Sequence, residues 1–330
     1  MLPTVSIVVV TRKGGRQLEE CIKSILDQNY PYDRYRVIVV GDSDAPIILS
    51  DLAQKYGVRI IGLNGKPGAK RNIALKEADS DIVAFCDDDV IVHREWLRTL
   101  TPYFTDSRVA VVGGPNLTPL HSNLRERCSG YIFSSFLGSA AMTARYLPDG
   151  ATVREADETD LISCNIAVRK SIFDKVGGFP ENIWPNEENI LLHLIKKAGY
   201  RLLYVPNAIV WHRRRPVFLE HVKQNFRYGR GRGKMTRRHL DSVKPIHFLS
   251  STFILLVMIG LIASIIGNML IKLIYMAALS VYFLIICVES LRISIERRDY
   301  LAFPLLPAAF FLHHCSYGLG FIVGLIGSDE

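Results

Sequence analysis

Short apolar runs alternate with amphipathic stretches through the first two-thirds of the chain. Between the runs, apolar residues recur at helical spacing, as at Leu18, Cys21 and Ile22. Continuous apolar strands joined by helices are typical of a parallel sheet that is covered on both faces. The pattern therefore predicts an α/β fold with a Rossmann-like, mostly parallel sheet. Its first five strands are predicted at residues 5–10, 35–40, 58–61, 81–86 and 109–113, and its helices at 18–26, 47–56, 67–78, 94–104 and 187–198.

The pattern is less regular after residue 113. Further strands are predicted at 161–168, 201–205 and 208–211. Between them, residues 117–158 contain an apolar patch around Tyr131 and Phe136. This patch fits either a core helix or an amphipathic segment that touches a membrane.

Three long apolar runs close the chain, at residues 248–266, 273–288 and 301–326. With their flanks they are long enough to span the hydrocarbon of a bilayer. Basic residues precede the first run and separate the second from the third. The positive-inside rule then predicts a cytoplasmic N-terminal part and a C-terminus outside. His313 and His314 in the last run are either functional or form an interhelical hydrogen bond.

The positive charge of the chain is concentrated in one segment. The formal net charge is +8, and residues 213–238 alone hold ten Lys or Arg and one Glu. Few aromatic residues, such as Phe226 and Tyr228, lie there to stack on bases, and a predicted span follows, so we expect anionic lipid or phosphate as the partner and no nucleic acid. The six cysteines form no CxxC pair, which argues against a zinc site. The expected domains are therefore 1–215, a basic interfacial segment at 216–245 and a membrane region at 246–330.

Three adjacent carboxylates, Asp87, Asp88 and Asp89, end the strand predicted at 81–86. Oxygen ligands of this kind suit Mg²⁺ or Mn²⁺, although a solvated helix-capping turn is the alternative. Thr11 with Arg12, and Asp42, follow two other predicted strands. The carboxyl ends of parallel strands share one edge of the sheet, where ligands bind, so we expect a single site there.

These features together resemble an inverting family 2 glycosyltransferase of the GT-A fold with a C-terminal membrane anchor. The resemblance covers roughly residues 5–233 and depends on the order of several short motifs. The motifs are Thr11-Arg12, Asp42-Ser43, Gly68-Ala69-Lys70-Arg71-Asn72, Asp87-Asp88-Asp89, Cys164-Asn165-Ile166-Ala167-Val168-Arg169, Val176-Gly177-Gly178-Phe179, Asn186-Glu187-Glu188-Asn189 and Gln224-Asn225-Phe226-Arg227-Tyr228.

The resemblance implies a metal–diphosphate centre at the acidic motif. Asp89 is then the direct ligand of Mg²⁺ or Mn²⁺, and Asp87 faces the ribose or binds the metal through water. Asp88 points away and caps the turn. His212 either completes the metal shell, contacts a phosphate or packs in the core.

Other motif residues are expected around the nucleotide. Asp42 accepts from the imide of uracil or from guanine, or else forms a turn with Ser43. Arg71 leans over the nucleotide or pairs with Asp87. Gly68 permits close backbone approach, and Thr11 and Arg12 complete this part of the site.

Glu188 is the expected general base for attack by the acceptor hydroxyl. Glu187 competes for this role, because the family usually has Glu-Asp at this point. Both glutamates alternatively only favour a helix N-terminus. Gln224, Arg227 and Tyr228 resemble the QxxRW motif of membrane polysaccharide synthases, in which the arginine neutralises the diphosphate and the aromatic residue lines the acceptor site.

The expected function is transfer of a sugar, with inversion, from a UDP- or GDP-sugar to a membrane-associated acceptor such as a lipid-linked glycan or a polysaccharide. Two alternatives remain open. One is a polyprenyl-phosphate sugar synthase, whose anionic acceptor needs no strong base. The other is an inactive nucleotide-sugar-binding subunit of a membrane complex.

Overall fold

A computed structural model describes residues 2–43, 46–148 and 152–327, with the backbone alone at 46–49 and 141. The chain divides into two compact units. The first holds residues 1–119 and 141–213, and the second holds residues 120–140 and 214–330. The last three residues of the predicted membrane region, 328–330, lie outside the described residues.

An eight-stranded sheet forms the centre of the first unit in the described residues, with the order β3-β2-β1-β4-β9-β6-β10-β8. β3, β2, β1 and β4 are parallel neighbours, and β6 is parallel to β10. This confirms the predicted α/β class. The strands are β1 Val5–Val10, β2 Tyr35–Gly41, β3 Arg59–Gly62, β4 Ile82–Asp87, β6 Val109–Gly113, β8 Arg154–Glu155, β9 Ile166–Arg169 and β10 Arg201–Tyr204.

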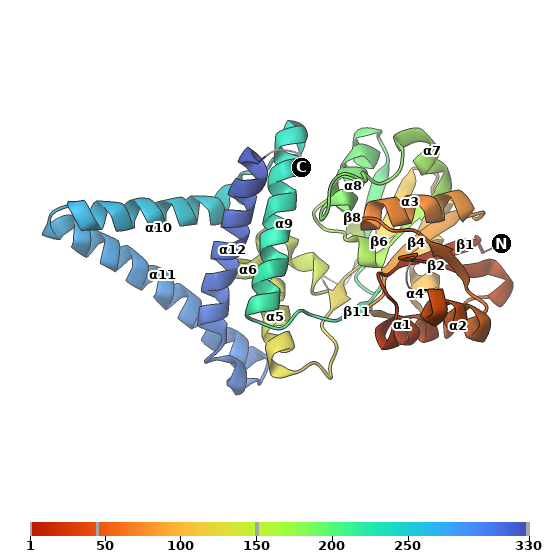
Figure 1. The fold of residues 1–330 in the computed structure, drawn as a ribbon, viewed down its shortest axis with the longest axis horizontal. Helices are drawn as coiled ribbons and strands as arrows, with labels where there is room; N and C mark the ends of the chain where they lie inside the picture. Colours follow the sequence, from red (N-terminus) through yellow and green to blue (C-terminus); the bar gives the residue numbers. More distant parts are fainter. Residues whose placement is uncertain (1, 44–45, 149–151, 328–330) are drawn as a thin grey trace. The chain divides into compact units, whose positions relative to one another are not determined.

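Alternate residues of the central strands enter two different hydrophobic cores. In β1, Val5, Ile7 and Val9 belong to one core, and Val8 and Val10 to the other. Because successive side chains of a strand point to opposite faces, both faces of the sheet must be covered by helices. Figure 1 shows α1 (Arg16–Leu26), α2 (Pro46–Tyr56) and α4 (Trp96–Leu100) over one face, and α3 (Pro67–Glu77), α7 (Phe173–Val176) and α8 (Glu187–Lys197) over the other.

Two predicted elements differ from the structure. Residues 161–168 were expected to form one strand, but Ser163–Asn165 form a 3₁₀ turn before β9, which is antiparallel to both β4 and β6. The helix expected at 94–104 is divided into α4 and the 3₁₀ segment Thr101–Thr105. Pro102 opens this second segment, because proline donates no N–H to the preceding turn.

A small second sheet of order β5-β11-β7 adjoins the acidic motif. Its strands are β5 (Val90–Val92), β11 (Val210–His212) and β7 (Asn116–Leu117). β5 and β11 are antiparallel, with His212 opposite Val90. This pairing brings His212 next to the turn that carries the three aspartates.

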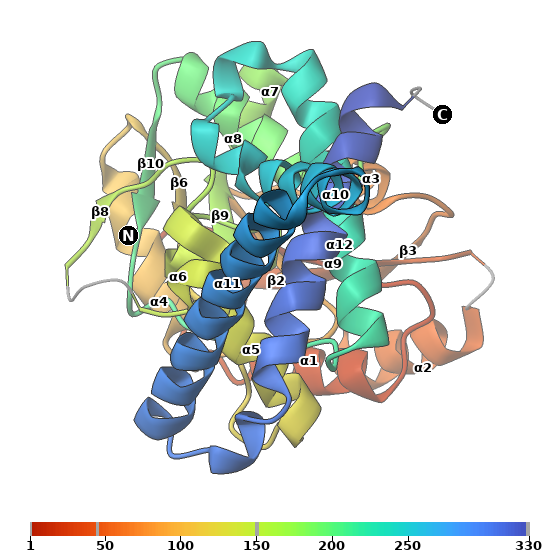
Figure 2. The same ribbon diagram turned by 90° about the vertical axis from the view of Figure 1, so that its left-hand side faces the viewer.

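The second unit is helical. It contains α5 (Leu124–Ser134), α6 (Phe136–Ser139), α9 (Leu219–Arg238), α10 (Leu249–Ile266), α11 (Met269–Glu296) and α12 (Leu306–Ile326). The helices at residues 245–266, 269–296 and 306–326 are long and apolar enough to cross a membrane. Figure 2 shows α12 and α9 side by side, as Figure 1 does. Cys128 and Ile132 of α5 share a core with Ile286 of α11 and Phe310 of α12, so residues 120–140 pack with the C-terminal helices.

Candidate functional site

The polar ends of β1, β2 and β4 lie side by side at one edge of the large sheet. Val10 pairs with Asp87 on one side and with Val40 on the other, so the residues that follow these strands are neighbours. Thr11 donates from Oγ1 to the Asp88 carboxylate at 2.5 Å and accepts from the backbone N–H of Gly14 at 3.0 Å. Asp88 therefore fixes the turn after β1, which agrees with its expected structural role.

Helix α3 supplies two buried cations to this edge. Lys70 is almost fully buried, and its Nζ bonds to the Asp42 carboxylate and, at 2.6 Å, to the carbonyl oxygen of Thr11. Asp42 is thus held by an ammonium group, while the backbone N–H of Ser43 donates to Asn64 at 2.8 Å. The Lys70 ammonium therefore fixes the position of the Asp42 carboxylate, whose oxygens accept hydrogen bonds.

Arg71 connects three elements around the acidic motif. Its Nη1 lies 2.5 Å from Glu187 Oε1, and its Nη2 lies 3.1 Å from Asp87 Oδ1 and 3.0 Å from Ser163 Oγ. The guanidinium also lies over the Phe179 ring, 5.3 Å from its centroid. The predicted pair of Arg71 with Asp87 is present, and Glu187 and Ser163 extend it.

Glu187 and Glu188 begin α8, where the helix dipole favours carboxylates. Burial raises the pKa of Glu187 to about 7, although the Arg71 guanidinium opposes the shift. The second oxygen of Glu187, Oε2, is buried and has no hydrogen-bond partner in the described residues. Glu188 is also buried, but no ion pair or hydrogen bond of its side chain occurs within the described part of the chain. One glutamate is therefore committed to Arg71, and the other is available for chemistry.

Asp89 and His212 form a second buried pair, with His212 Nε2 3.0 Å from Asp89 Oδ1. Burial alone would lower the pKa of His212, but the charge of Asp89 outweighs it and raises this pKa well above its ordinary value. His212 Nδ1 is buried without a partner among the residues described.

The donor set at Asp89 and His212 fits a small divalent cation. Asp89 supplies a carboxylate oxygen, the kind of ligand that Mg²⁺ and Mn²⁺ prefer, and His212 would supply a neighbouring imidazole nitrogen once it gives up its proton. No cluster of three or more His, Cys, Asp or Glu occurs in the described ranges.

The remaining predicted residues lie either in the first unit, as Arg12 and Gly68 do, or in α9 of the second unit. Arg12 is exposed, and its carbonyl oxygen accepts from the backbone N–H of Asp42 at 3.1 Å. A Cβ on Gly68 would lie 2.6 Å from the carbonyl oxygen of Pro180, so packing within the chain accounts for this glycine without a nucleotide. Gln224, Arg227 and Tyr228 belong to α9 of the second unit, where Gln224 Nε2 donates to the Tyr228 hydroxyl at 3.0 Å.

Asn72 and Lys70 were not predicted individually. Asn72 donates from Nδ2 to the carbonyl oxygen of Phe179 at 2.9 Å and accepts from its N–H at 2.8 Å. A Cβ on Gly178 would lie 2.3 Å from Asn72 Oδ1. The Lys70-Arg71-Asn72 run is the signal in the sequence that indicates these two residues. The strand ends supply more carboxylates than cations, so cations from elsewhere are needed to pair with them.

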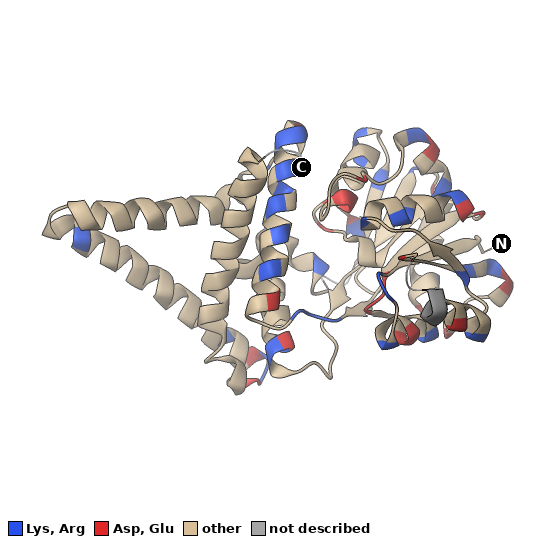
Figure 3. Cartoon of the chain, viewed as in Figure 1, with Lys and Arg blue, Asp and Glu red and all other residues tan. Residues whose placement is uncertain are grey.

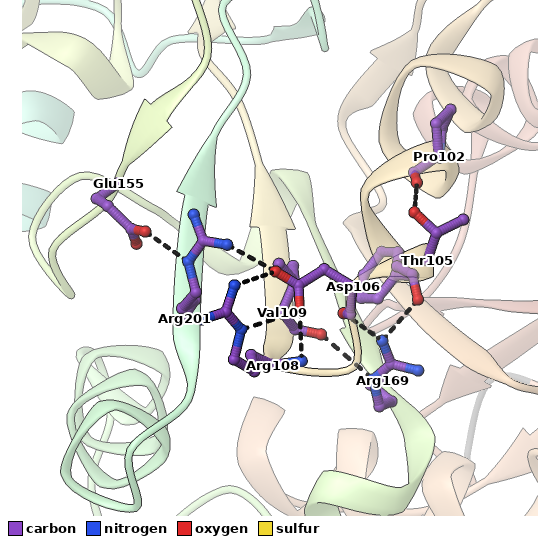
Figure 4. Close-up of polar contacts among 9 residues, drawn as sticks. Pro102, Thr105, Asp106, Arg108, Val109, Glu155, Arg169 and Arg201 are labelled. Atoms are coloured by element: carbon purple, nitrogen blue, oxygen red, sulfur yellow. Dashed lines mark hydrogen bonds and ion pairs between the residues drawn. The ribbon is translucent and has the colours of Figure 1, made fainter.

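A hollow of about 330 Å³ lies at the opposite edge of the sheet, at the start of β6 and β10. Figure 4 shows that its charges pair with one another: Asp106 accepts from Arg201 at 2.7 Å and from Arg108, and Arg201 donates to Glu155 at 2.6 Å. Arg108 lowers the pKa of Asp106 to about 2. Because these groups satisfy each other, we place the candidate site at the carboxyl edge.

Comparisons with known proteins agree with this fold. The model of the family described as "Glycosyl transferase family 2" matches residues 6–177. The chain is 28% identical over 246 residues to the pre-mycofactocin glycosyltransferase of Mycobacterium tuberculosis, covering 73% of this chain and 49% of the relative. It therefore spans about half the length of that relative.

Two relatives match over more of their own length. Glycosyltransferase AglE of Haloferax volcanii is 26% identical, with 70% of this chain and 73% of the relative covered. The dolichyl N-acetyl-alpha-D-glucosaminyl phosphate 3-beta-D-2,3-diacetamido-2,3-dideoxy-beta-D-glucuronosyltransferase of Methanococcus voltae is 22% identical, with 99% of this chain and 98% of the relative covered.

A solved structure shows a similar fold. It is the mannosyltransferase PcManGT from Pyrobaculum calidifontis in complex with GDP-Man and Mn²⁺. The TM-score is 0.61 and the sequence identity 17%, with 96% of this chain and 87% of the other covered. With its GT-A-like sheet and the family match over residues 6–177, the chain belongs to glycosyl transferase family 2.

Proposed function

We propose that the protein is an inverting glycosyltransferase that moves a sugar from a UDP- or GDP-sugar to a membrane-associated acceptor. The observation that carries the proposal is the pair of glutamates at the start of α8. Glu187 is bound to Arg71 at 2.5 Å, whereas the buried Glu188 makes no side-chain hydrogen bond or ion pair among the described residues. Inversion in one step requires one such carboxylate to accept the proton of the attacking hydroxyl.

The roles of the other residues follow from their contacts. Asp42, held in position by Lys70, accepts from the N–H that uracil and guanine both present next to a carbonyl group. Arg71 holds Asp87 and Glu187 in fixed positions. A Mg²⁺ or Mn²⁺ ion held by Asp89, with His212 beside it and Asp87 acting through water, would supply positive charge to the departing diphosphate.

We place the catalytic unit at the cytoplasmic face of a membrane, because three apolar helices follow a strongly basic segment. Arg227 and Tyr228 in that segment are proposed to contact the diphosphate and the acceptor. The full-length similarity to a relative named for transfer to a dolichyl phosphate-linked sugar supports a lipid-linked glycan as the acceptor.

The decisive experiment uses membranes that contain the full chain and a panel of UDP-, GDP-, ADP- and CDP-sugars with Mg²⁺ or Mn²⁺. We expect nucleotide release and sugar transfer to a lipid fraction with a UDP- or GDP-sugar only. Glu188→Gln should lower transfer by about 10²- to 10⁴-fold. Glu77→Gln, on the exposed face of α3, is the matched control.

Two results would redirect the proposal. If Glu188→Gln keeps most of the activity with a polyprenyl phosphate acceptor, the acceptor is the phosphate itself and no base is needed. If no sugar in the panel is hydrolysed or transferred, the enzymatic function is wrong and a binding role remains.

A further inference from the structure

Helices α9 and α12 run side by side in the same direction over most of their length. Near their starts, His221 Nε2 lies 2.9 Å from His313 Nδ1. One turn later Asn225 Nδ2 donates to the carbonyl oxygen of His313 at 2.6 Å. Near their ends, Arg237 bonds to the carbonyl oxygen of Gly327. The two helices therefore share one axis direction for about four turns.

Glycines bring the two backbones into direct contact. A Cβ on Gly229 of α9 would lie 2.1 Å from the carbonyl oxygen of Tyr317. A Cβ on Gly320 of α12 would lie 2.1 Å from the carbonyl oxygen of Phe226. Spacing of this kind leaves no room for lipid or water between helices, so α9 and α12 must occupy the same depth in any membrane.

The two helices differ completely in charge. Between Leu306 and Ile326, α12 has no Asp, Glu, Lys or Arg. Figure 3 shows basic bands recurring along α9, while α12 is uncharged. Five of the basic positions follow helical spacing along α9: Lys223, Arg227, Arg230, Lys234 and Arg237.

A helix with this charge is not expected to cross hydrocarbon, because each Lys or Arg at the centre of a bilayer is costly. If α12 crossed the membrane, α9 would have to cross beside it. We propose that α9 and α12 lie together in the plane of the membrane surface, and that the α10–α11 hairpin is the part of the described second unit that crosses the bilayer. α12 would then face the lipid, and α9 would lie at the depth of the headgroups.

The α10–α11 hairpin, unlike α12, leaves most of its apolar residues unburied by the protein, as a membrane-crossing segment does. In the most apolar stretch of α10 and of α11 only 6% of residues are buried inside the protein, against 44% in α12. The tip of the hairpin is Gly267–Asn268, and the last turns of α11 return to charged residues, with Arg292 bonded to Glu289 and Glu296 at 2.7 Å. Two crossings put the C-terminus on the same side as the catalytic unit, whereas three crossings would put it on the other side.

The first test maps the side of three positions in sealed membrane vesicles of both orientations. Single cysteines replace Lys76, Asn268 or Ser328 in full-length protein that carries Cys287→Ala and Cys315→Ala, and each is labelled with a membrane-impermeant maleimide. We expect Ser328 and Lys76 to be labelled from one side and Asn268 from the other, each at least fivefold above the parent. Labelling in detergent provides the full signal for each position.

The second test measures the depth of α12 directly. Leu312, Leu319 and Ile326 are spaced by seven residues and so share one side of the helix, and Leu319 and Ile326 are exposed. Each is replaced by a cysteine carrying a fluorophore, and depth is read from quenching by brominated lipids. A helix in the surface plane should give depths within about 5 Å of one another. A crossing helix should spread them over about 21 Å.

Labelling of Ser328 from the side opposite Lys76, or depths that change steadily along α12, would overturn the proposal. Labelling of Asn268 from the same side as Lys76 would also overturn it, because the hairpin would not cross. None of these outcomes depends on sugar transfer. The proposed enzymatic function can therefore be wrong while this membrane arrangement is right, and the arrangement can be wrong while the enzymatic function is right.

Discussion

Helix α3 in the first unit and helix α9 in the second are both basic, but they use their charges in opposite ways. The two buried cations of α3, Lys70 and Arg71, each lie against carboxylates. The basic residues of α9 instead recur at helical spacing, and its close approach to α12 depends on glycines that let the two backbones meet. In α3 the charge itself holds the elements together, whereas in α9 the small size of the glycines lets the helices pack closely. The two helices should therefore fail under different substitutions.

The largest effect is expected for Arg71→Met. The substitution keeps most of the volume but leaves Glu187 buried without its cation, which costs about 3–5 kcal/mol of unfolding free energy. Activity should be lost as well. Urea unfolding in detergent, followed by the fluorescence of the buried Trp96, measures the change. Lys76→Met on the exposed side of the same helix is the control, and equal stability of the two variants would contradict the role given to Arg71.

A slightly smaller effect is expected at the proposed metal position. Asp89→Asn removes a charged ligand, and we expect transfer to fall by about 10²- to 10³-fold, as when one electrostatic contact to a developing charge is lost. Chelation with EDTA should abolish activity of the parent, and Mn²⁺ should restore it. Asp79→Asn, on the surface, should behave as the parent. Full activity in EDTA would exclude the metal.

Gly320→Ala tests the glycine contact of α9 with α12. The added methyl group meets the backbone of α9, so the cost should be about 1–3 kcal/mol, as for an overpacked core. A Cβ on Gly65, by contrast, would lie 3.5 Å from the Cβ of Ala69, which is ordinary contact, so Gly65→Ala should cost little. Thermal unfolding in detergent compares the two. Similar melting temperatures would mean that the helices can separate freely.

The smallest effect is expected for Lys70→Met. The Asp42 side chain is 20% exposed, so water can replace part of the lost ion pair. We expect KM for the donor to rise about tenfold, or about 1.4 kcal/mol, with little change in kcat, because Lys70 positions a base-binding group. Lys66→Met, at an exposed position just before α3, is the control. A fall in kcat with unchanged KM would assign Lys70 to the chemical step instead.

Much of the first unit could be predicted because burial leaves a direct pattern in the sequence. β1, β2 and β4 are continuous apolar runs, and the polar residues that end them meet at one edge, as expected. The direction of β9 could not be predicted, since a strand that is buried on both faces has the same apolar pattern whichever way it runs. Its place between β4 and β6 depends on long-range pairing.

The partners of the site residues were harder to predict than the residues themselves. Ser163 and Asn72 lie far apart in sequence, yet both fix the surroundings of Arg71. The glycines of α9 were read as part of a basic segment. Their four-residue spacing at Gly229 and Gly233, repeated at Gly320 and Gly324, is the signal that indicates a close helix pair.

The assignment of residues 120–140 to the second unit has a consequence for synthesis. This segment emerges from the ribosome long before α11 and α12, which supply the partners of Ile132 and Cys128. At typical elongation rates the delay is on the order of ten seconds. During that time the buried side of α5 is without its partners, and the catalytic sheet is itself incomplete until β10 is made. The nascent chain must therefore be shielded by a chaperone or by the membrane itself before its own C-terminus can cover it.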